Sequence, residues 1–178
     1  MSVKQHTSTM RFWSPTFQLR QEEVELKPGR ITTLNIVNHP DAVTILPVDA
    51  QGKVIFIKQY RHPAKQTLLE LPAGTLEGQE APEAAAQREL QEEIGMKADK
   101  LEEIASFYLA PGYSTELMHV FLATGLKASR LPQDEDEVIE LAPLPVSEAL
   151  AKAVAGELKD AKSLAAVLLA AKRLGWAG

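Results

Sequence analysis

The pattern of apolar and polar residues over the first forty positions is typical of β-strands. Val24 and Leu26 stand between charged neighbours, and residues 27–30 read Lys-Pro-Gly-Arg, which is a turn signal. The following run, 31–37, is β-branched and rich in threonine, which favours a returning strand. We therefore expect an N-terminal β extension over residues 1–40.

In the rest of the chain, residues 41–178, the pattern predicts strands around one central helix, followed by two helices at the end. Apolar runs indicate strands at 42–48, 54–57, 104–109 and 117–123, and further short apolar segments lie at 68–71 and 138–141. The central helix lies between Pro82, which fits a first helical turn, and Gly95, which fits a C-terminal cap. Ala/Leu-rich segments predict helices at about 147–155 and 160–174. This order predicts an α/β (α+β) fold with a mixed sheet flanked by helices.

Composition narrows the class of protein. With 178 residues, 45% hydrophobic and 24% charged, the chain has the size and balance of an ordinary globular domain. Its net charge of −5 argues against nucleic acid as a partner. No apolar run approaches the roughly 20 residues that span a bilayer, and the first residues do not resemble an export signal. We therefore expect no membrane partner and a cytoplasmic location.

The absence of cysteine leaves carboxylates as the main candidates for chemistry. Glu89, Glu92 and Glu93 fall within about a 100° arc of the central helix, because each residue advances about 100°. Their repulsion would need a positive group to offset it if this face is partly buried. Hard oxygen donors suit Mg²⁺ or Mn²⁺ better than zinc. The simpler alternative is a solvated acidic helix face.

The residue spacing over positions 74–96 favours a metal site over a solvated acidic helix face. Gly74 is followed after five residues by Glu80, and after seven more by Arg-Glu-Leu-Gln-Glu-Glu-Ile-Gly-Met at 88–96. This pattern resembles the signature of the Nudix hydrolases at every defined position. The resemblance implies an α/β/α sandwich, the Nudix fold, whose loop and helix hold metal ions that bridge a diphosphate. It also implies that Glu80 supports the loop.

The resemblance assigns roles to the helix. Glu89 and Glu93 would be the principal metal ligands and catalytic residues, and Glu92 would be a further ligand. The backbone carbonyl of Ala73 would supply another oxygen. Arg88 would orient a glutamate, with Glu92 as the expected partner because it lies one turn away.

Flanking segments resemble the branch of ADP-ribose pyrophosphatases, although related nucleotide-sugar hydrolases share several of these features. They include Gln-Tyr-Arg at 59–61, Glu-Leu-Pro-Ala-Gly at 70–74, and a proline, Pro111, 16 residues after Gly95. In this branch Arg61 would bind a phosphate. The alternative is a surface arginine that ends a strand.

Two loops carry the remaining candidates. Gly112 and Glu116 would contact substrate, Glu116 through ribose hydroxyls or a positioned water, unless Glu116 only forms a loop salt bridge. An acidic run occupies residues 134–137. By the same resemblance, a glutamate of this run would be the general base, with Glu137 as first choice and Glu135 as second. The alternative is a solvated acidic loop.

The expected reaction is Mg²⁺- or Mn²⁺-dependent hydrolysis of ADP-ribose to AMP and ribose 5-phosphate. The alternatives are hydrolysis of another nucleotide sugar, such as a GDP- or ADP-hexose, and a non-catalytic domain that binds ADP-ribose. Many members of the branch carry an arginine about five residues before the His-Pro pair at 39–40, where this chain has Leu34. Arg30 or Arg20 could replace it. The resemblance and the N-terminal strands also imply a homodimer formed through the extension.

Overall fold

A computed structural model describes residues 3–133 and 138–176 of the chain. The chain forms two compact units. The first joins Met1–Asp41 to Tyr108–Leu117, and the second joins Ala42–Phe107 to Met118–Gly178. In the described part of the chain, no helix has the length and apolar character needed to cross a membrane.

The first unit is built on an antiparallel sheet with the strand order β1-β2-β3. The strands are β1 (Lys4–Trp13), β2 (Gln18–Lys27) and β3 (Arg30–Asn38). Gly29 has a φ of +77° in the turn between β2 and β3, a conformation that glycine adopts without strain. The backbone of Val37 also exchanges hydrogen bonds with Tyr113 and Thr115, at 2.7 and 3.0 Å. The predicted turn and returning strand are therefore confirmed.

The second unit contains two sheets. A four-stranded sheet has the order β7-β4-β9-β8, in which β4 is antiparallel to β7 and parallel to β9. A three-stranded antiparallel sheet has the order β10-β5-β6. The strands are β4 (Ala42–Pro47), β5 (Lys53–Arg61), β6 (Gln66–Glu70), β7 (Ala73–Thr75), β8 (Met96–Tyr108), β9 (Leu117–Ala128) and β10 (Ile139–Pro145). The mixed sheet expected from the sequence is confirmed.

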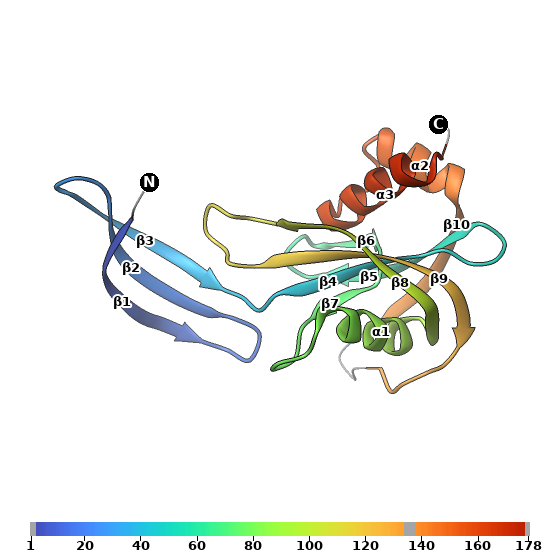
Figure 1. Ribbon diagram of the computed structural model, residues 1–178, viewed down its shortest axis with the longest axis horizontal. Coiled ribbons are helices and arrows are strands. Elements are labelled where there is room, and N and C mark those ends of the chain that lie inside the picture. The colour runs from blue at the N-terminus through green and yellow to red at the C-terminus, as the bar shows by residue number, and fades with distance from the viewer. Residues whose placement is uncertain (1–2, 134–137, 177–178) are drawn as a thin grey trace. The chain divides into compact units, whose positions relative to one another are not determined.

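Helices cover this unit on both sides (Figure 1). They are α1 (Pro82–Glu93), α2 (Val146–Val154) and α3 (Ala161–Leu174). On one side, Leu90 of α1 packs in a core with Val43, Ile45 and Phe121. On the other side, α3 buries Val167. Successive strand residues point to opposite faces, so β4 supplies apolar side chains to both layers. The predicted α/β/α sandwich is present.

Two strands differ from the sequence expectation. β8 begins at Met96, directly after α1, rather than near residue 104. It is the edge strand of its sheet and is only partly buried, so its first half lacks the apolar run used to predict it. The three-residue strand β7 was not predicted. It is too short for any periodic pattern to be recognised.

Candidate active site

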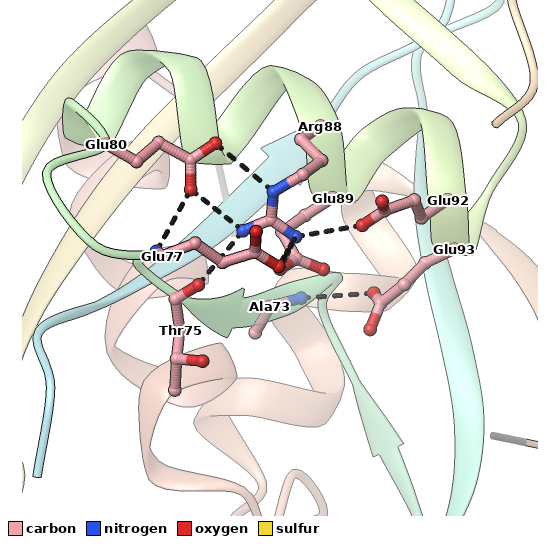
Figure 2. A network of polar contacts seen from close by, with 8 residues as sticks. All are labelled: Ala73, Thr75, Glu77, Glu80, Arg88, Glu89, Glu92 and Glu93. Atoms are coloured by element: carbon pink, nitrogen blue, oxygen red, sulfur yellow. Dashed lines mark hydrogen bonds and ion pairs between the residues drawn. The ribbon is translucent and has the colours of Figure 1, made fainter. Parts of the chain in front are cut away.

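The candidate site lies where β7 meets the C-terminal half of α1 (Figure 2). Helix α1 carries all three clustered glutamates. Glu89 and Glu93 are buried, with 8% and 5% of their surface exposed, and the side chain of Glu92 is 25% exposed. The acidic face is therefore partly buried, which excludes the simple alternative of a solvated surface. Such burial requires compensating partners.

Arg88 provides the positive group that this face requires (Figure 2). Its Nη1 donates to Glu89 Oε1 at 2.7 Å and to Glu92 Oε2 at 2.9 Å. Its Nε and Nη2 donate to the carboxylate of Glu80 at 3.2 and 3.0 Å, and Nη2 also donates to the Thr75 carbonyl at 3.0 Å. One guanidinium thus ties the loop to the helix, and its planar set of five donors allows this.

These contacts change the acidity of the groups involved. Burial alone would lower the pKa of Arg88, but the hydrogen bonds and charges of Glu80, Glu89 and Glu92 outweigh it and raise that pKa. The hydrogen bonds from Arg88 also lower the pKa of Glu80. Arg88 therefore remains charged, and Glu80 stays ionised to a lower pH than an ordinary glutamate.

The backbone of β7 approaches the carboxylates of α1 closely. The Ala73 N–H donates to Glu93 Oε2 at 3.1 Å. A Cβ added at Gly74 would lie 1.8 Å from Glu89 Oε1. Glycine at position 74 therefore leaves room for the Glu89 carboxylate, which any larger residue would have to displace.

The donor set fits a hard divalent cation. The carboxylates of Glu89, Glu92 and Glu93 share one partly buried helix face beside the backbone of residues 73–74, where glycine leaves room for them. Across residues 3–133 and 138–176, no cluster of three or more His, Asp or Glu side chains is gathered as a ready metal site. Instead, Glu89 and Glu92 contact Arg88, and Glu93 contacts Ala73 N.

Arg61, the predicted phosphate ligand, is the last residue of β5 and forms a two-point ion pair. Its Nε and Nη2 donate to Glu70 Oε1 and Oε2, both at 2.8 Å. Lys162 Nζ donates to Glu70 Oε2 at 2.5 Å. Burial alone would raise the pKa of Glu70, which is 1% exposed, but Arg61 and Lys162 outweigh it and lower that pKa. Glu70 is therefore an ionised and fully paired buried carboxylate.

Two of the loop candidates do not belong to the second unit. Gly112 and Glu116 belong to the first unit. Gly112 is exposed, and a Cβ there would meet no other atom. Glu116 Oε1 lies 3.9 Å from His39 Nδ1, the kind of loop ion pair considered as its alternative role. Glu135 and Glu137 lie outside the described residues, so the general base stays a prediction from the sequence.

Sequence reasoning missed the contribution of α3. Ser163 Oγ accepts from the Leu71 N–H at 2.7 Å, two residues before Ala73, and Lys162 reaches Glu70. A signal for both residues was available. The buried stripe of α3, at 166, 167, 170 and 171, extends back by one turn to 162 and 163. A lysine on the apolar stripe of a helix requires a buried anion as its partner.

Replacing the buried carboxylate should reveal its stabilising role. Glu70→Gln leaves Arg61 and Lys162 without their shared anion, so it should lower the free energy of unfolding by about 3 kcal/mol at neutral pH. Because the folded pKa lies below the ordinary value of 4.5, this contribution is present above that pH and disappears as the pH falls through the folded pKa. Urea unfolding of both proteins at several pH values measures the difference.

The control for this change is Glu140→Gln, which removes an exposed partner of Lys58. That ion pair spans 2.6 Å, and the Glu140 side chain is 71% exposed. It should change the free energy of unfolding by well under about 1 kcal/mol. Equal effects of the two substitutions, or a Glu70→Gln effect that persists unchanged in acid, would contradict the assignment.

Gly74→Ala should harm activity more than folding. The new Cβ collides with the end of the Glu89 side chain, which can rotate away, so the melting temperature should change by only a few degrees. Displacing Glu89 should lower kcat at least about tenfold. Gly78→Ala is a control for the loop, since a Cβ there meets no atom although its φ of +55° adds some strain. Equal kcat values for Gly74→Ala and the wild type would exclude this role of the glycine.

The chain is similar to proteins of one known family. A family model described as the NUDIX domain matches residues 38–167. An ADP-ribose pyrophosphatase of Bacillus subtilis is 42% identical over 88% of this chain and 85% of its own length. A GDP-mannose pyrophosphatase of Yersinia pestis is 34% identical over 83% of this chain and 81% of its own length.

A solved structure is similar to this chain in its fold. A crystal structure of an ADP compounds hydrolase superposes with a TM-score of 0.87 at 22% identity, covering 98% of this chain and 95% of its own. The fold inferred from the sequence is thereby confirmed. The match over residues 38–167, which includes the whole loop and helix of the candidate site, shows that the chain belongs to the NUDIX domain family.

Proposed function

We propose that this protein hydrolyses the diphosphate of ADP-ribose to AMP and ribose 5-phosphate with the help of a divalent ion, Mg²⁺ or Mn²⁺. The observation that carries the proposal is the complete set of acidic residues on α1, partly buried beside Gly74, in a chain 42% identical to an ADP-ribose pyrophosphatase. Water adds to one phosphorus atom, the bridging P–O bond breaks, and each product keeps one phosphate.

The residues of α1 and β7 would hold the ion. Glu89, Glu92 and Glu93 would supply carboxylate oxygens, and Ala73 would supply its carbonyl oxygen. Such an ion neutralises charge on a diphosphate and activates water for attack. Arg88 would hold Glu89 and Glu92 in place from one side, as its present contacts with both support.

Two further groups would act on the substrate. Arg61 would bind a phosphate through the part of its guanidinium that Glu70 does not occupy, since 40% of its side chain is exposed. Glu137 would take the proton from the attacking water. Gly112 and Glu116 would contact the ribose.

A second candidate substrate is a nucleotide hexose, which the 34% identity to a GDP-mannose pyrophosphatase favours. The test measures phosphate released by an added phosphatase after incubation with ADP-ribose, GDP-mannose and ADP-glucose, because the monophosphate products are cleaved and the intact substrates are not. We expect the highest kcat/KM with ADP-ribose. A higher value with GDP-mannose would replace the proposed substrate, and no release from any of them would favour the non-catalytic binding domain.

We also propose that residues 1–40 form a separate extension that pairs two chains into a homodimer, with residues 41–178 as the hydrolase domain. Support comes from exposed apolar side chains on this segment: Val3, Met10, Phe12, Trp13, Phe17, Leu26 and Ile31. Large exposed apolar groups in one segment are typical of an interaction surface. Light scattering after size-exclusion chromatography would distinguish a dimer from a monomer.

The cytoplasmic location stays a prediction.

A further inference from the structure

Four charged side chains, one of them Glu70 at the end of β6, form a cluster. Arg61 comes from β5, Glu70 from β6, and Asp160 and Lys162 from the start of α3. Besides its bond to Glu70, Lys162 Nζ lies 3.0 Å from Asp160 Oδ1. The side chains of Glu70, Lys162 and Asp160 are 1%, 10% and 15% exposed. We call these four residues the α3 charge cluster; it contains two cations and two anions.

Helix stability alone does not account for the lysine in this cluster. Lys162 lies in the first turn of α3, where the helix dipole disfavours a positive charge. It is also buried, and removing a lysine from water is costly. The capping role at this end belongs to Asp160, which accepts from the Ser163 N–H at 3.1 Å. The ion pairs of Lys162 with Glu70 and Asp160, and not the helix, offset this unfavourable position.

The charge balance around Arg61 indicates a second role for Lys162. Glu70 binds Arg61 at two points, and an arginine paired in this way with a single carboxylate presents little net charge to another anion. Lys162 shares the same carboxylate, so Arg61, Glu70 and Lys162 together carry one positive charge. The hydrogen bonds to Glu70 and the negative charges of Glu70, Asp160 and Glu93 outweigh burial and raise the pKa of Arg61, so the arginine stays charged.

We propose that Lys162 is a positioning residue for substrate binding: by neutralising Glu70, it leaves Arg61 with an effective positive charge for the diphosphate. The inference rests on the proposed function, because it assumes a diphosphate substrate. Glu70 fixes the direction of the Arg61 guanidinium, and Lys162 supplies the charge that this pairing would otherwise cancel. Asp160 reduces the effect, since its charge also acts on Arg61.

Calorimetric titration with ADP in the presence of Mg²⁺ tests the role of Lys162 in binding without turnover. Lys162→Met should weaken ADP binding about tenfold and raise KM similarly while leaving kcat within about twofold. Lys162→Arg should retain most of the affinity. Asp160→Asn keeps a capping oxygen but removes a negative charge, so it should tighten ADP binding about twofold to threefold. The double variant with Lys162→Met and Asp160→Asn should return close to wild-type affinity.

The matched control is Lys152→Met on α2, whose Nζ pairs with the exposed Glu157 at 3.0 Å. It should leave ADP binding unchanged. The difference between Lys162→Met and the wild type should shrink with added salt, because screening weakens charge effects. If Lys162→Met is too unstable to assay, the tighter binding of Asp160→Asn carries the test.

The outcomes separate this inference from the proposed function. A wild-type protein that binds ADP but hydrolyses no nucleotide sugar contradicts the function, whereas weaker ADP binding by Lys162→Met would still support the role of the lysine. Unchanged ADP affinity in folded Lys162→Met, or in Asp160→Asn, overturns the inference even if the enzyme is active. Weaker binding that the double variant does not recover indicates a purely structural role and overturns it too.

Discussion

Chelation of divalent ions should abolish hydrolysis of ADP-ribose. The carboxylates of α1 suit a hard cation, and the diphosphate brings further negative charge to the same site. Without the ion, the negative charges of substrate and helix face repel each other. We expect turnover in excess chelator to fall below about 1% of the rate with Mg²⁺, measured by phosphatase-coupled phosphate release.

Restoring the ion completes this test. Added Mg²⁺ or Mn²⁺ in excess of the chelator should recover the rate, whereas the same concentration of a monovalent salt should not. Mg²⁺ should also raise the melting temperature of the wild type, because a ligand that binds only the folded state stabilises it by mass action. Full activity in excess chelator would contradict the proposed metal site.

Glu93→Gln should reduce kcat at least about a hundredfold, which corresponds to a loss of about 3 kcal/mol of transition-state stabilisation. The substitution keeps the size of the side chain but removes a buried negative charge. An amide oxygen can still accept from the Ala73 N–H, which now donates to Glu93 Oε2 at 3.1 Å. The fold should therefore survive, with a melting temperature within a few degrees of the wild type in chelator.

Glu83→Gln provides the matched control for this variant. Glu83 lies in the first turn of the same helix and is exposed, so its charge is remote from the last turn, where Glu93 lies. It should leave kcat nearly unchanged. If Glu93→Gln keeps most of its activity, or if both variants lose it equally, the assignment of Glu93 as a principal ligand is wrong.

The local sequence determined the central helix and its chemistry. Pro82 and Gly95 mark the limits of α1, and the structure confirms the helix at Pro82–Glu93. The spacing of Glu89, Glu92 and Glu93 follows from helix periodicity, so one segment was enough to place them on one face. The order of apolar runs similarly predicted the mixed sheet, because a strand buried on both faces is apolar at consecutive positions.

Tertiary structure decided which distant groups complete the site. Arg88 was expected to contact Glu92, one turn away, but it also binds Glu80 and the Thr75 carbonyl, which the folded loop brings to it. Glu70 and Lys162 are 92 residues apart in sequence and share a hydrogen bond. Periodicity relates residues only within one element, whereas these contacts depend on how separate strands and helices pack. The partners of Glu70 therefore emerged from the packing of α3 against the strands.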